Sequence, residues 1–415
     1  MRIERLGDLG AAADVLRALA HAADRRSLPP PAALIGDWFG SAAVIAPSVD
    51  IRPVDPAAVF DTGSGRRSDA VGGGWVGYLS YPDPGADGAP PRLPPAAGGW
   101  TDCVLRLDGD GCWWFESLAG QPMPAWVATG LASPPPAGGW QIAWGEPDAD
   151  AHRAGVLSCL AAISAGEIYQ ACVCTQFTGA LTGSALDFFA DAVARTTPGR
   201  AAYVAGRWGA IASLSPELFL RRAGDRVDSS PIKGTLPLHA DPARLRSSAK
   251  DVAENIMIVD LVRNDLGHVA HVGSVTVPEL LAVRRAPGVW HLVSTVSARV
   301  PADLPMPVLL EATFPPASVT GTPKSRARQL LSGWEPVRRG VYCGSVGMAS
   351  PLAGTELNVA IRTVEFDGHG GTVLGVGGGI TADSDADAEW QECLDKAAPI
   401  VQLTPQPSRA RSTAS

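Results

Sequence analysis

The feature that most limits how this chain can fold is the irregular order of its strand-like and helix-like segments after residue 148. Short apolar segments such as RGVYCGSVGMAS, ELNVAIRTVEF and GGTVLGVGGGI follow one another with only turn residues between them. Parallel strands need a long crossover, usually a helix, after each strand. Because these crossovers do not recur, the pattern predicts an α+β fold with antiparallel sheets rather than repeated βαβ units.

The character of the chain changes near residue 148. Residues 1–147 are broken up by Pro- and Gly-rich segments, and apolar segments such as CVLRLDGDGCWWF between them predict strands joined by tight turns. Beyond Asp148, helical spacing recurs at 148–167, at 248–266 and from about Asp383 to Val401. We therefore expect a β-rich N-terminal region over 1–147, a second region over 148–403 and a disordered tail over 404–415.

Composition narrows the classes of function. The chain has 415 residues, of which 46% are hydrophobic and 18% charged, as is typical of a globular protein. A net charge of −8 offers no basic surface for nucleic acid, and no run of 18 apolar residues could span a membrane. The N-terminus lacks the basic-then-apolar layout of a signal peptide, and the seven scattered cysteines suit a reducing compartment. We expect a cytoplasmic protein that binds neither nucleic acid nor a membrane.

Lysine is rare in this chain. Of the 34 basic residues only four are lysines, and the other thirty are arginines. The four are Lys233, Lys250, Lys324 and Lys396. A lysine amine can become a nucleophile once it loses its proton, whereas an arginine side chain stays charged. At least one of these lysines is therefore a candidate for chemistry, although chance placement explains them equally well.

Two acidic patterns could hold a metal ion. Glu389, Glu392 and Lys396 lie at helical spacing on one face of the last helix, where paired carboxylates suit Mg²⁺. A solvated face with a Glu392–Lys396 ion pair is the more common explanation of such spacing. Glu254 lies within a strongly apolar helix, so its carboxylate needs either a metal or an ion pair with an arginine such as Arg263.

Two further segments are candidates for the site. Lys233 lies in PIKGT, sixteen residues after Glu217, and the two could act as nucleophile and general acid or form a structural ion pair. The glycines of GVGGGI (375–380) could let backbone N–H groups converge on an anion, although glycine runs more often mark a tight turn.

Taken together, these segments resemble the chorismate-binding enzymes over roughly residues 151–401. The matching blocks, in family order, are GEIYQACVCTQF, SPELFL, PIKGTLP, SAKDVAENIMIVDLVRNDLG, VWHLVSTV, FPPASVTGTPKSRA, YCGSVGMAS, AIRTVEF, GVGGGITADS and EWQECLDKA. The resemblance implies the fold of that family, in which antiparallel β-sheets pack together and are flanked by helices. It also implies that residues 148–403 form the chorismate-binding catalytic region.

The resemblance implies roles for particular residues. It places Mg²⁺ at Glu254, Glu389 and Glu392. The groups that it places at the substrate are Gly234, Thr235, Tyr342, Arg362, Lys396 and the backbone of Gly377, Gly378 and Gly379. Glu217 would protonate the departing 4-hydroxyl of chorismate, and His291 would assist. Ser318 and Thr320 would shape the side of the pocket from which the nucleophile comes.

Two positions distinguish members of the family. Members that add water carry a lysine where this chain has Gln170, and glutamine cannot act as a base. Members that aminate ring carbon 2 carry a small residue where this chain has Lys233, whereas PIKGT is typical of members that aminate ring carbon 4, on the way to p-aminobenzoate and folate. In those members the lysine is thought to bond to ring carbon 2 before ammonia attacks carbon 4, which requires an amine without its proton.

The chain contains no cysteine in a GxCxG-like elbow, so we expect ammonia to come from a separate glutamine amidotransferase subunit. Two alternatives remain open. One is amination at ring carbon 2, which gives anthranilate or 2-amino-2-deoxyisochorismate. The other is a non-catalytic protein that keeps the fold and senses chorismate.

Overall fold

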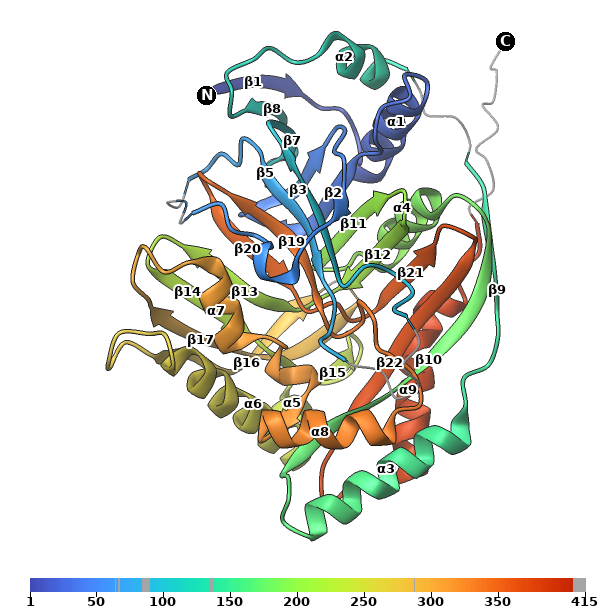
Figure 1. The fold of residues 1–415 in the computed structure, drawn as a ribbon, viewed down its shortest axis with the longest axis vertical. Helices are drawn as coiled ribbons and strands as arrows, with labels where there is room; N and C mark the ends of the chain where they lie inside the picture. The colour runs from blue at the N-terminus through green and yellow to red at the C-terminus, as the bar shows by residue number, and fades with distance from the viewer. Residues whose placement is uncertain (64, 66–67, 84–89, 134–137, 287, 406–415) are drawn as a thin grey trace.

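The computed structural model describes residues 1–63, 65, 68–83, 90–133, 138–286 and 288–405. Two large antiparallel β-sheets form its centre, and helices cover their outer faces (Figure 1). The predicted α+β fold with antiparallel sheets is therefore confirmed. Most of the tail that we expected to be disordered, residues 406–415, lies outside the described residues.

The larger sheet contains, in spatial order, β1 (Arg2–Gly7), β8 (Trp113–Ser117), β7 (Cys103–Leu107), β3 (Ser41–Ala46), β2 (Ala32–Trp38), β11 (Arg200–Gly206), β12 (Gly209–Ser215), β21 (Thr363–Asp367), β22 (Gly371–Ile380), β10 (Gln170–Gly183) and β18 (Gly321–Thr322), with β9 (Trp140–Trp144) also paired to β10. The smaller sheet contains β15 (Ile232–Pro237), β17 (Val289–Arg299), β14 (Arg226–Ser230), β13 (Leu218–Ala223), β20 (Gly354–Asn358), β19 (Ser345–Ser350), β5 (Gly74–Leu79), β6 (Ala96–Thr101) and β4 (Arg52–Pro53), with β16 (Thr276–Ala286) paired to β17.

The α-helices are α1 (Ala12–Asp24), α2 (Ala125–Leu131), α3 (Ala149–Ser164), α4 (Ala185–Thr196), α5 (Ala243–Ser247), α6 (Ala249–Gly267), α7 (Met306–Thr313), α8 (Lys324–Trp334) and α9 (Ala386–Val401). Short 3₁₀ turns occur at η1 (Pro56–Ala58) and η2 (Ala317–Val319). The three helices expected after residue 148 correspond to α3, α6 and α9. Each begins after a residue whose side chain accepts hydrogen bonds from the first turn, namely Asp148, Ser248 and Asp385.

Strands from both parts of the chain share both sheets. In the larger sheet β2 pairs with β11, with Gly36 opposite Arg200. In the smaller sheet β5 pairs with β19, with Gly77 opposite Gly347. Backbone hydrogen bonds therefore join residues 1–147 to residues 148–403 within each sheet.

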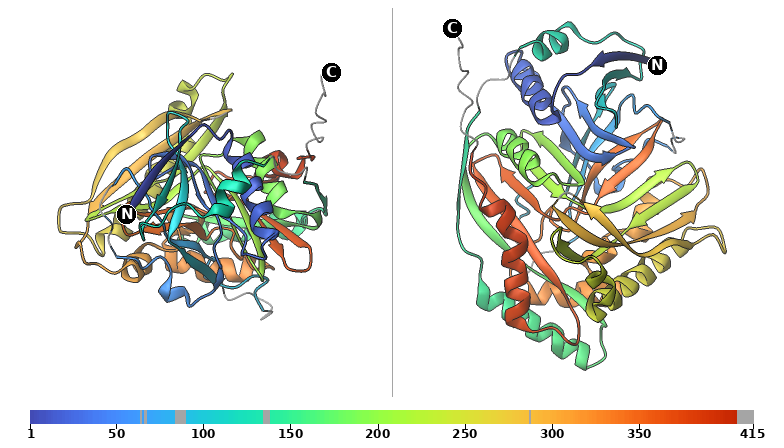
Figure 2. Two further views of the ribbon diagram at one scale, coloured as in Figure 1. Left: turned by 90° about the horizontal axis from the view of Figure 1, so that it is seen from above. Right: turned by 180° about the vertical axis from the view of Figure 1, so that it is seen from behind.

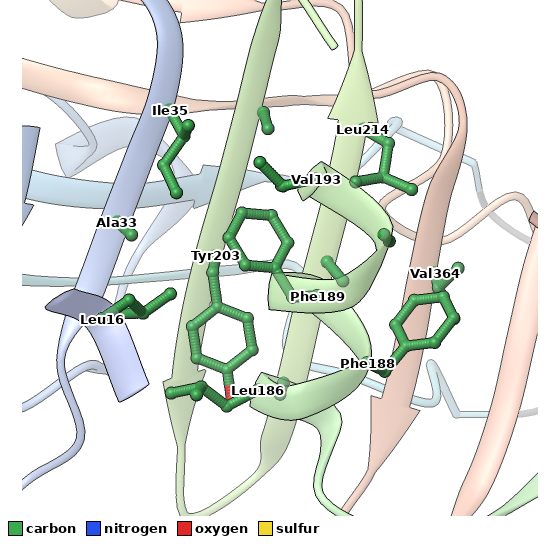
Figure 3. Close-up of a cluster of buried hydrophobic side chains, with 14 of the residues drawn as sticks. Leu16, Ala33, Ile35, Leu186, Phe188, Phe189, Val193, Tyr203, Leu214 and Val364 are labelled. Carbon is green, nitrogen blue, oxygen red and sulfur yellow. The ribbon is translucent and has the colours of Figure 1, made fainter. Parts of the chain in front are cut away.

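A buried cluster holds helices against the larger sheet. The apolar side of α4, including Phe188 and Phe189, packs on Tyr203 and Val364 of the sheet, and Leu16 of α1 extends the same cluster (Figure 3). Fully burying one such side chain contributes about 1.5–3 kcal/mol. This packing stabilises the larger sheet, to which β22 and β10 belong.

Two helices border the end of β22 that carries the glycine run. α9 lies along β22 (Figure 2, right). α6 packs against β17 and other parts of the smaller sheet through Ile258, Val262 and Leu266, which are buried. Residues 375–380 form part of β22, so the interpretation of GVGGGI as a tight turn was wrong.

Candidate active site

The glycine-rich end of β22 lies at an open edge of the larger sheet. On one side, β10 pairs with β22 over its whole length, from Gly371 to Ile380. On the other side, β21 pairs with β22 only at Thr372–Leu374. Among the described strand pairings, the second edge of residues 375–380 therefore carries no strand, and side chains from α6 and α9 meet there instead.

The backbone direction along this edge follows from the pairing with β10. Cys174, opposite Gly377, donates its N–H to Glu335 rather than to β22. Gly377 therefore belongs to a non-hydrogen-bonded pair, and its N–H and C=O point to the open edge. Its carbonyl accepts a hydrogen bond of 2.8 Å from Lys396 Nζ there. Because the pattern repeats every two residues, the N–H of Gly379 points the same way and could also bind an anion.

Lys233 points into this region. Its side chain is only 14% exposed, and Nζ lies 3.4 Å from Oε2 of Glu254. A Cβ on Gly379 would stand 3.1 Å from this Nζ, 3.3 Å from Glu254 Oε2 and 3.5 Å from Gln170 Oε1. The space for these three groups thus depends on a glycine. The expected pairing of Glu254 with Arg263 was wrong, because Arg263 pairs with Asp260 at 2.8 Å.

Glu389, Glu392 and Lys396 project from α9 to the same edge, on the other face of the sheet. Lys396 Nζ lies 2.7 Å from Glu392 Oε1, which confirms the predicted ion pair. Burial raises the pKa of Glu392, but Lys396 and Lys250 outweigh this effect, so the net pKa is lowered. The face is not simply solvated, because Glu389 is 2% exposed.

Glu389 is a buried carboxylate with an unused acceptor. Its Oε1 accepts hydrogen bonds from Ser384 Oγ at 2.6 Å and from Lys250 Nζ at 2.9 Å. Its Oε2 is buried without a hydrogen-bond partner, 2.9 Å from where a Cβ on Gly378 would stand. Sequence reasoning assigned no role to Lys250 or Ser384. The scarcity of lysine was the only signal that pointed to Lys250.

These carboxylates fit a divalent cation. Within the described residues, no group of three His, Cys, Asp or Glu side chains already stands in a metal-holding arrangement. Each carboxylate faces a lysine instead: Glu254 faces Lys233, and Glu392 faces Lys396. Glu389 nevertheless keeps one oxygen without a partner, a side chain at position 378 would crowd that oxygen, and carboxylate oxygens are the donors that Mg²⁺ prefers.

Glu217 has the properties of a general acid. It lies between β12 and β13 and is buried, and burial raises its pKa to about 7. A hydrogen bond with Ser318 and the charge of Lys233 act in the opposite direction. The carboxyl group is therefore partly protonated near neutral pH, as proton donation to a leaving group requires.

Arg362 places a guanidinium near this acid. Burial lowers its pKa, and the nearby Glu217 counteracts that effect. Its backbone has a φ of +51°, in the left-handed region that arginine rarely adopts. Such a conformation persists only where the surrounding structure holds it, often at functional sites.

His291 and Thr235 lie opposite each other on β17 and β15. His291 Nδ1 is 2.9 Å from Thr235 Oγ1. Burial lowers the pKa of His291 to about 4, and the charge of Arg362 adds to this effect. The imidazole is therefore neutral near pH 7. Gly234 precedes Thr235 with a φ of +79°, which favours glycine at this turn of the strand.

Two predicted binding residues make their described contacts with the scaffold. The ring of Tyr342 packs on Gly375, where a Cβ would stand 2.3 Å from the ring. Thr320 is fully buried, and its hydroxyl donates to the carbonyl of Pro316 at 2.9 Å. The structure thus gathers Lys233, Lys250 and Lys396 with the carboxylates and glycines at the open edge, and these two side chains behind it.

The molecule thus combines an antiparallel α+β fold with acidic, lysine-paired groups at a glycine-rich sheet edge. The sequence model of the chorismate binding enzyme family matches residues 117–402. The chain belongs to this family.

Relatives with assigned names support this placement. The chain is 44% identical over 243 residues to aminodeoxychorismate synthase component 1 of Klebsiella aerogenes, covering 56% of this chain and 53% of the relative. It is 36% identical over 377 residues to aminodeoxychorismate synthase of Streptomyces pristinaespiralis, covering 82% of this chain and 52% of the relative. The chain thus spans about half the length of these curated relatives.

Solved structures show the same fold. Anthranilate synthase component I of Streptococcus pneumoniae matches with a TM-score of 0.70 at 22% identity, over 97% of this chain and 92% of that one. The menaquinone-specific isochorismate synthase of Escherichia coli matches with a TM-score of 0.69 at 18% identity, over 97% and 94%. The predicted fold of the chorismate-binding enzymes is therefore confirmed.

Proposed function

We propose that this chain is component I of an aminodeoxychorismate synthase and aminates chorismate at ring carbon 4. The observation that carries the proposal is the position of Lys233, whose amine points to Glu254 and the open edge of β22 rather than to solvent. The similarity to relatives named aminodeoxychorismate synthase component 1 supports the same assignment. The alternatives without a nucleophilic lysine leave this amine only its ion pair with Glu254.

The positive groups of the site bind and orient the substrate. The N–H groups of Gly377 and Gly379, together with Lys396 and Arg362, offer donors to the two carboxylates of chorismate. These local donors are needed because the net charge of −8 opposes an incoming dianion. Mg²⁺ held by Glu254, Glu389 and Glu392 would neutralise a substrate carboxylate. We place the ring between Lys233 and Glu217.

The reaction then proceeds in two substitutions on the ring. Lys233 Nζ, without its proton, bonds to ring carbon 2, the ring double bonds shift, and the 4-hydroxyl leaves as water with the proton of Glu217. Neutral His291 donates or accepts a hydrogen bond at the departing oxygen. Ammonia then bonds to carbon 4, the double bonds shift back, and the bond from carbon 2 to Lys233 breaks. The proton released from the attacking nitrogen returns to Glu217.

Ammonia is the second substrate of this proposal. We propose that a separate glutamine amidotransferase subunit supplies it, because the name component 1 of the similar proteins implies a further component. In vitro, free ammonium should replace that subunit.

No helix among the described residues is long and apolar enough to cross a membrane. The cytoplasmic location and the absence of nucleic-acid binding stay predictions from the sequence.

A product assay tests the proposed function. The purified chain is incubated with chorismate, Mg²⁺ and ammonium, with and without an added aminodeoxychorismate lyase. Release of p-aminobenzoate that depends on the lyase supports amination at carbon 4. Anthranilate formed without the lyase would instead assign the chain to amination at carbon 2. Tight chorismate binding with no turnover would identify a sensor.

A further inference from the structure

All four lysines of the chain pair with carboxylates. Lys324 pairs with Asp265 at 2.5 Å, away from the open edge. The other three each pair with a different member of the carboxylate set assigned to the metal: Lys233 with Glu254, Lys250 with Glu389 and Lys396 with Glu392. Three ammonium groups therefore balance three carboxylates when nothing is bound.

Lys250 differs from the other two lysines of the edge in its position. It is the second residue of α6 and reaches Glu389 on α9, so its ion pair connects the helices on the two faces of the sheet. Its side chain is 42% exposed, whereas that of Lys233 is 14% exposed. Lys396 is held by a second bond, to the carbonyl of Gly377. Lys250 can therefore leave its carboxylate for solvent at lower cost than the other two.

Glu389, the partner of Lys250, is poorly satisfied for a buried carboxylate. It is 2% exposed, and its Oε2 has no hydrogen-bond partner and lies close to Gly378. An ionised carboxylate at such depth needs a counter-charge close by. A half-exposed ammonium on one oxygen is a weak counter-charge, and a divalent cation bound by the other oxygen is a stronger one.

We propose that Lys250 is an exchangeable counter-ion of Glu389, which holds this carboxylate while no metal is bound and gives way when a divalent cation binds. The reason is competition for one carboxylate together with repulsion between the ammonium and the ion. The metal ion (+2) and the substrate dianion (−2) together add no net charge to the site. Once Lys250 has moved away, three carboxylates face only two lysines, and the remaining negative charge favours binding of the metal. This inference rests on the metal site of the proposed function but not on which ring carbon is aminated.

Titration with Mn²⁺ tests the proposal without chorismate. Free Mn²⁺ is followed by electron paramagnetic resonance as it is added to the wild type and to Lys250→Met, and Mg²⁺ is used to displace it. We expect the variant to bind Mn²⁺ about fivefold more tightly, because a half-exposed ammonium that competes for the carboxylate opposes metal binding by roughly that factor. Without metal, the variant should melt at a lower temperature than the wild type, and saturating Mg²⁺ should close most of the gap.

Two matched variants separate competition from general loss of stability. Lys324→Met also removes a lysine from an ion pair, and it should lower the melting temperature equally with and without Mg²⁺ while leaving Mn²⁺ affinity unchanged. Lys250→Arg keeps a positive charge that holds the carboxylate at least as firmly, so it should bind Mn²⁺ no more tightly than the wild type does. An unchanged or weaker Mn²⁺ affinity in Lys250→Met, or no Mn²⁺ binding in either protein, would overturn the proposal. The Mn²⁺ titration can support the exchange of Lys250 even if the product assay finds no amination at carbon 4. Equally, the product assay can succeed while the titration shows no such exchange.

Discussion

The Arg339–Glu335 ion pair and the lysine pairs of the open edge are built in opposite ways. Arg339 donates to both oxygens of Glu335, at 2.6 and 2.8 Å, and also to the carbonyls of Val319 and Cys172. Glu335 in turn accepts the N–H of Cys174. The planar guanidinium supplies several donors in fixed directions, so both carboxylate oxygens of Glu335 accept hydrogen bonds. The pair ties β10, η2 and the segment after α8 together.

The lysine pairs at the open edge are incomplete by comparison. Oε2 of Glu389 is buried without a hydrogen-bond partner, and so is Oε1 of Gln170, beside Lys233. An ammonium is a point charge that can move away, whereas an arginine fork is held by several bonds at once. We therefore expect the Arg339–Glu335 pair to be permanent and the lysine pairs of the open edge to be replaceable by a ligand. The predictions below test that distinction.

The largest expected effect is on catalysis. Lys233→Ala removes the proposed nucleophile, so amination at carbon 4 should fall by about 10⁴-fold. Ring carbon 2 would then be open to ammonia, and any remaining product should be aminated there. Products are identified by chromatography after incubation with chorismate, Mg²⁺ and ammonium. Mass spectrometry of the wild type with chorismate but no ammonia should show a covalent adduct on Lys233.

This variant has a clear contrary outcome. If Lys233→Ala still aminates carbon 4 at the wild-type rate, then Lys233 is not the nucleophile. Lys324→Ala serves as the matched control, because it removes a lysine that pairs with Asp265 and should leave the product unchanged. If Lys324→Ala lowers the free energy of unfolding and Lys233→Ala does not, then the Lys324–Asp265 pair is permanent and the Lys233–Glu254 pair is replaceable.

The second prediction concerns the permanent pair. Arg339→Met leaves Glu335 as a buried charge without a counter-ion, and we expect the free energy of unfolding to fall by about 4 kcal/mol. Chemical denaturation followed by fluorescence measures the change. Lys396→Met, at the open edge, should cost under about 1 kcal/mol because Glu392 is 44% exposed and can be solvated. Equal costs for the two variants would contradict the comparison.

Local patterns predicted much of the fold. Apolar spacing and capping residues located α3, α6 and α9, because these signals act within one or two turns of the helix. The Glu392–Lys396 pair was likewise visible as an i, i+4 spacing. The turn at CVLRLDGDGCWWF became the hairpin of β7 and β8. In each case the partners are close in the sequence.

The open edge could not be predicted in this way. It exists because β21 stops pairing with β22 after Leu374, and strand register is set by the whole sheet rather than by local residues. The Lys250–Glu389 pair joins residues 139 positions apart. Family resemblance, rather than spacing, suggested Glu254, Glu389 and Lys233 as one group, while it left Lys250 and Ser384 without a role.

The third prediction follows from the pKa of Glu217. Below about pH 4.5 this carboxyl group is protonated in both the folded and the unfolded chain, so burial costs nothing. As the pH rises to about 7 the unfolded chain ionises first, and the folded state loses stability. Glu217→Gln removes this loss and should raise the free energy of unfolding at pH 8.5 by about 2 kcal/mol, with little change at pH 4.5.

The same substitution separates stability from activity. Glu217→Gln cannot donate the proton, so amination should fall about 10³-fold even though the protein is more stable at high pH. In the wild type, the rate should decline above pH 7 as Glu217 ionises. A variant that is less stable at pH 8.5, or a rate that is flat between pH 6 and 9, would show that Glu217 is a structural group.

The smallest expected effect is at Glu392, the most exposed carboxylate of the edge. Glu392→Gln should weaken Mg²⁺ binding about tenfold, because the neutral amide is a poorer ligand than a carboxylate. The free energy of unfolding should change by less than about 1 kcal/mol, because the lost ion pair with Lys396 is partly solvated. Calorimetric titration with Mg²⁺ and thermal denaturation of the same samples measure both quantities. An unaltered metal titration with a large loss of stability would assign Glu392 to the permanent class and remove the distinction between lysine and arginine pairs.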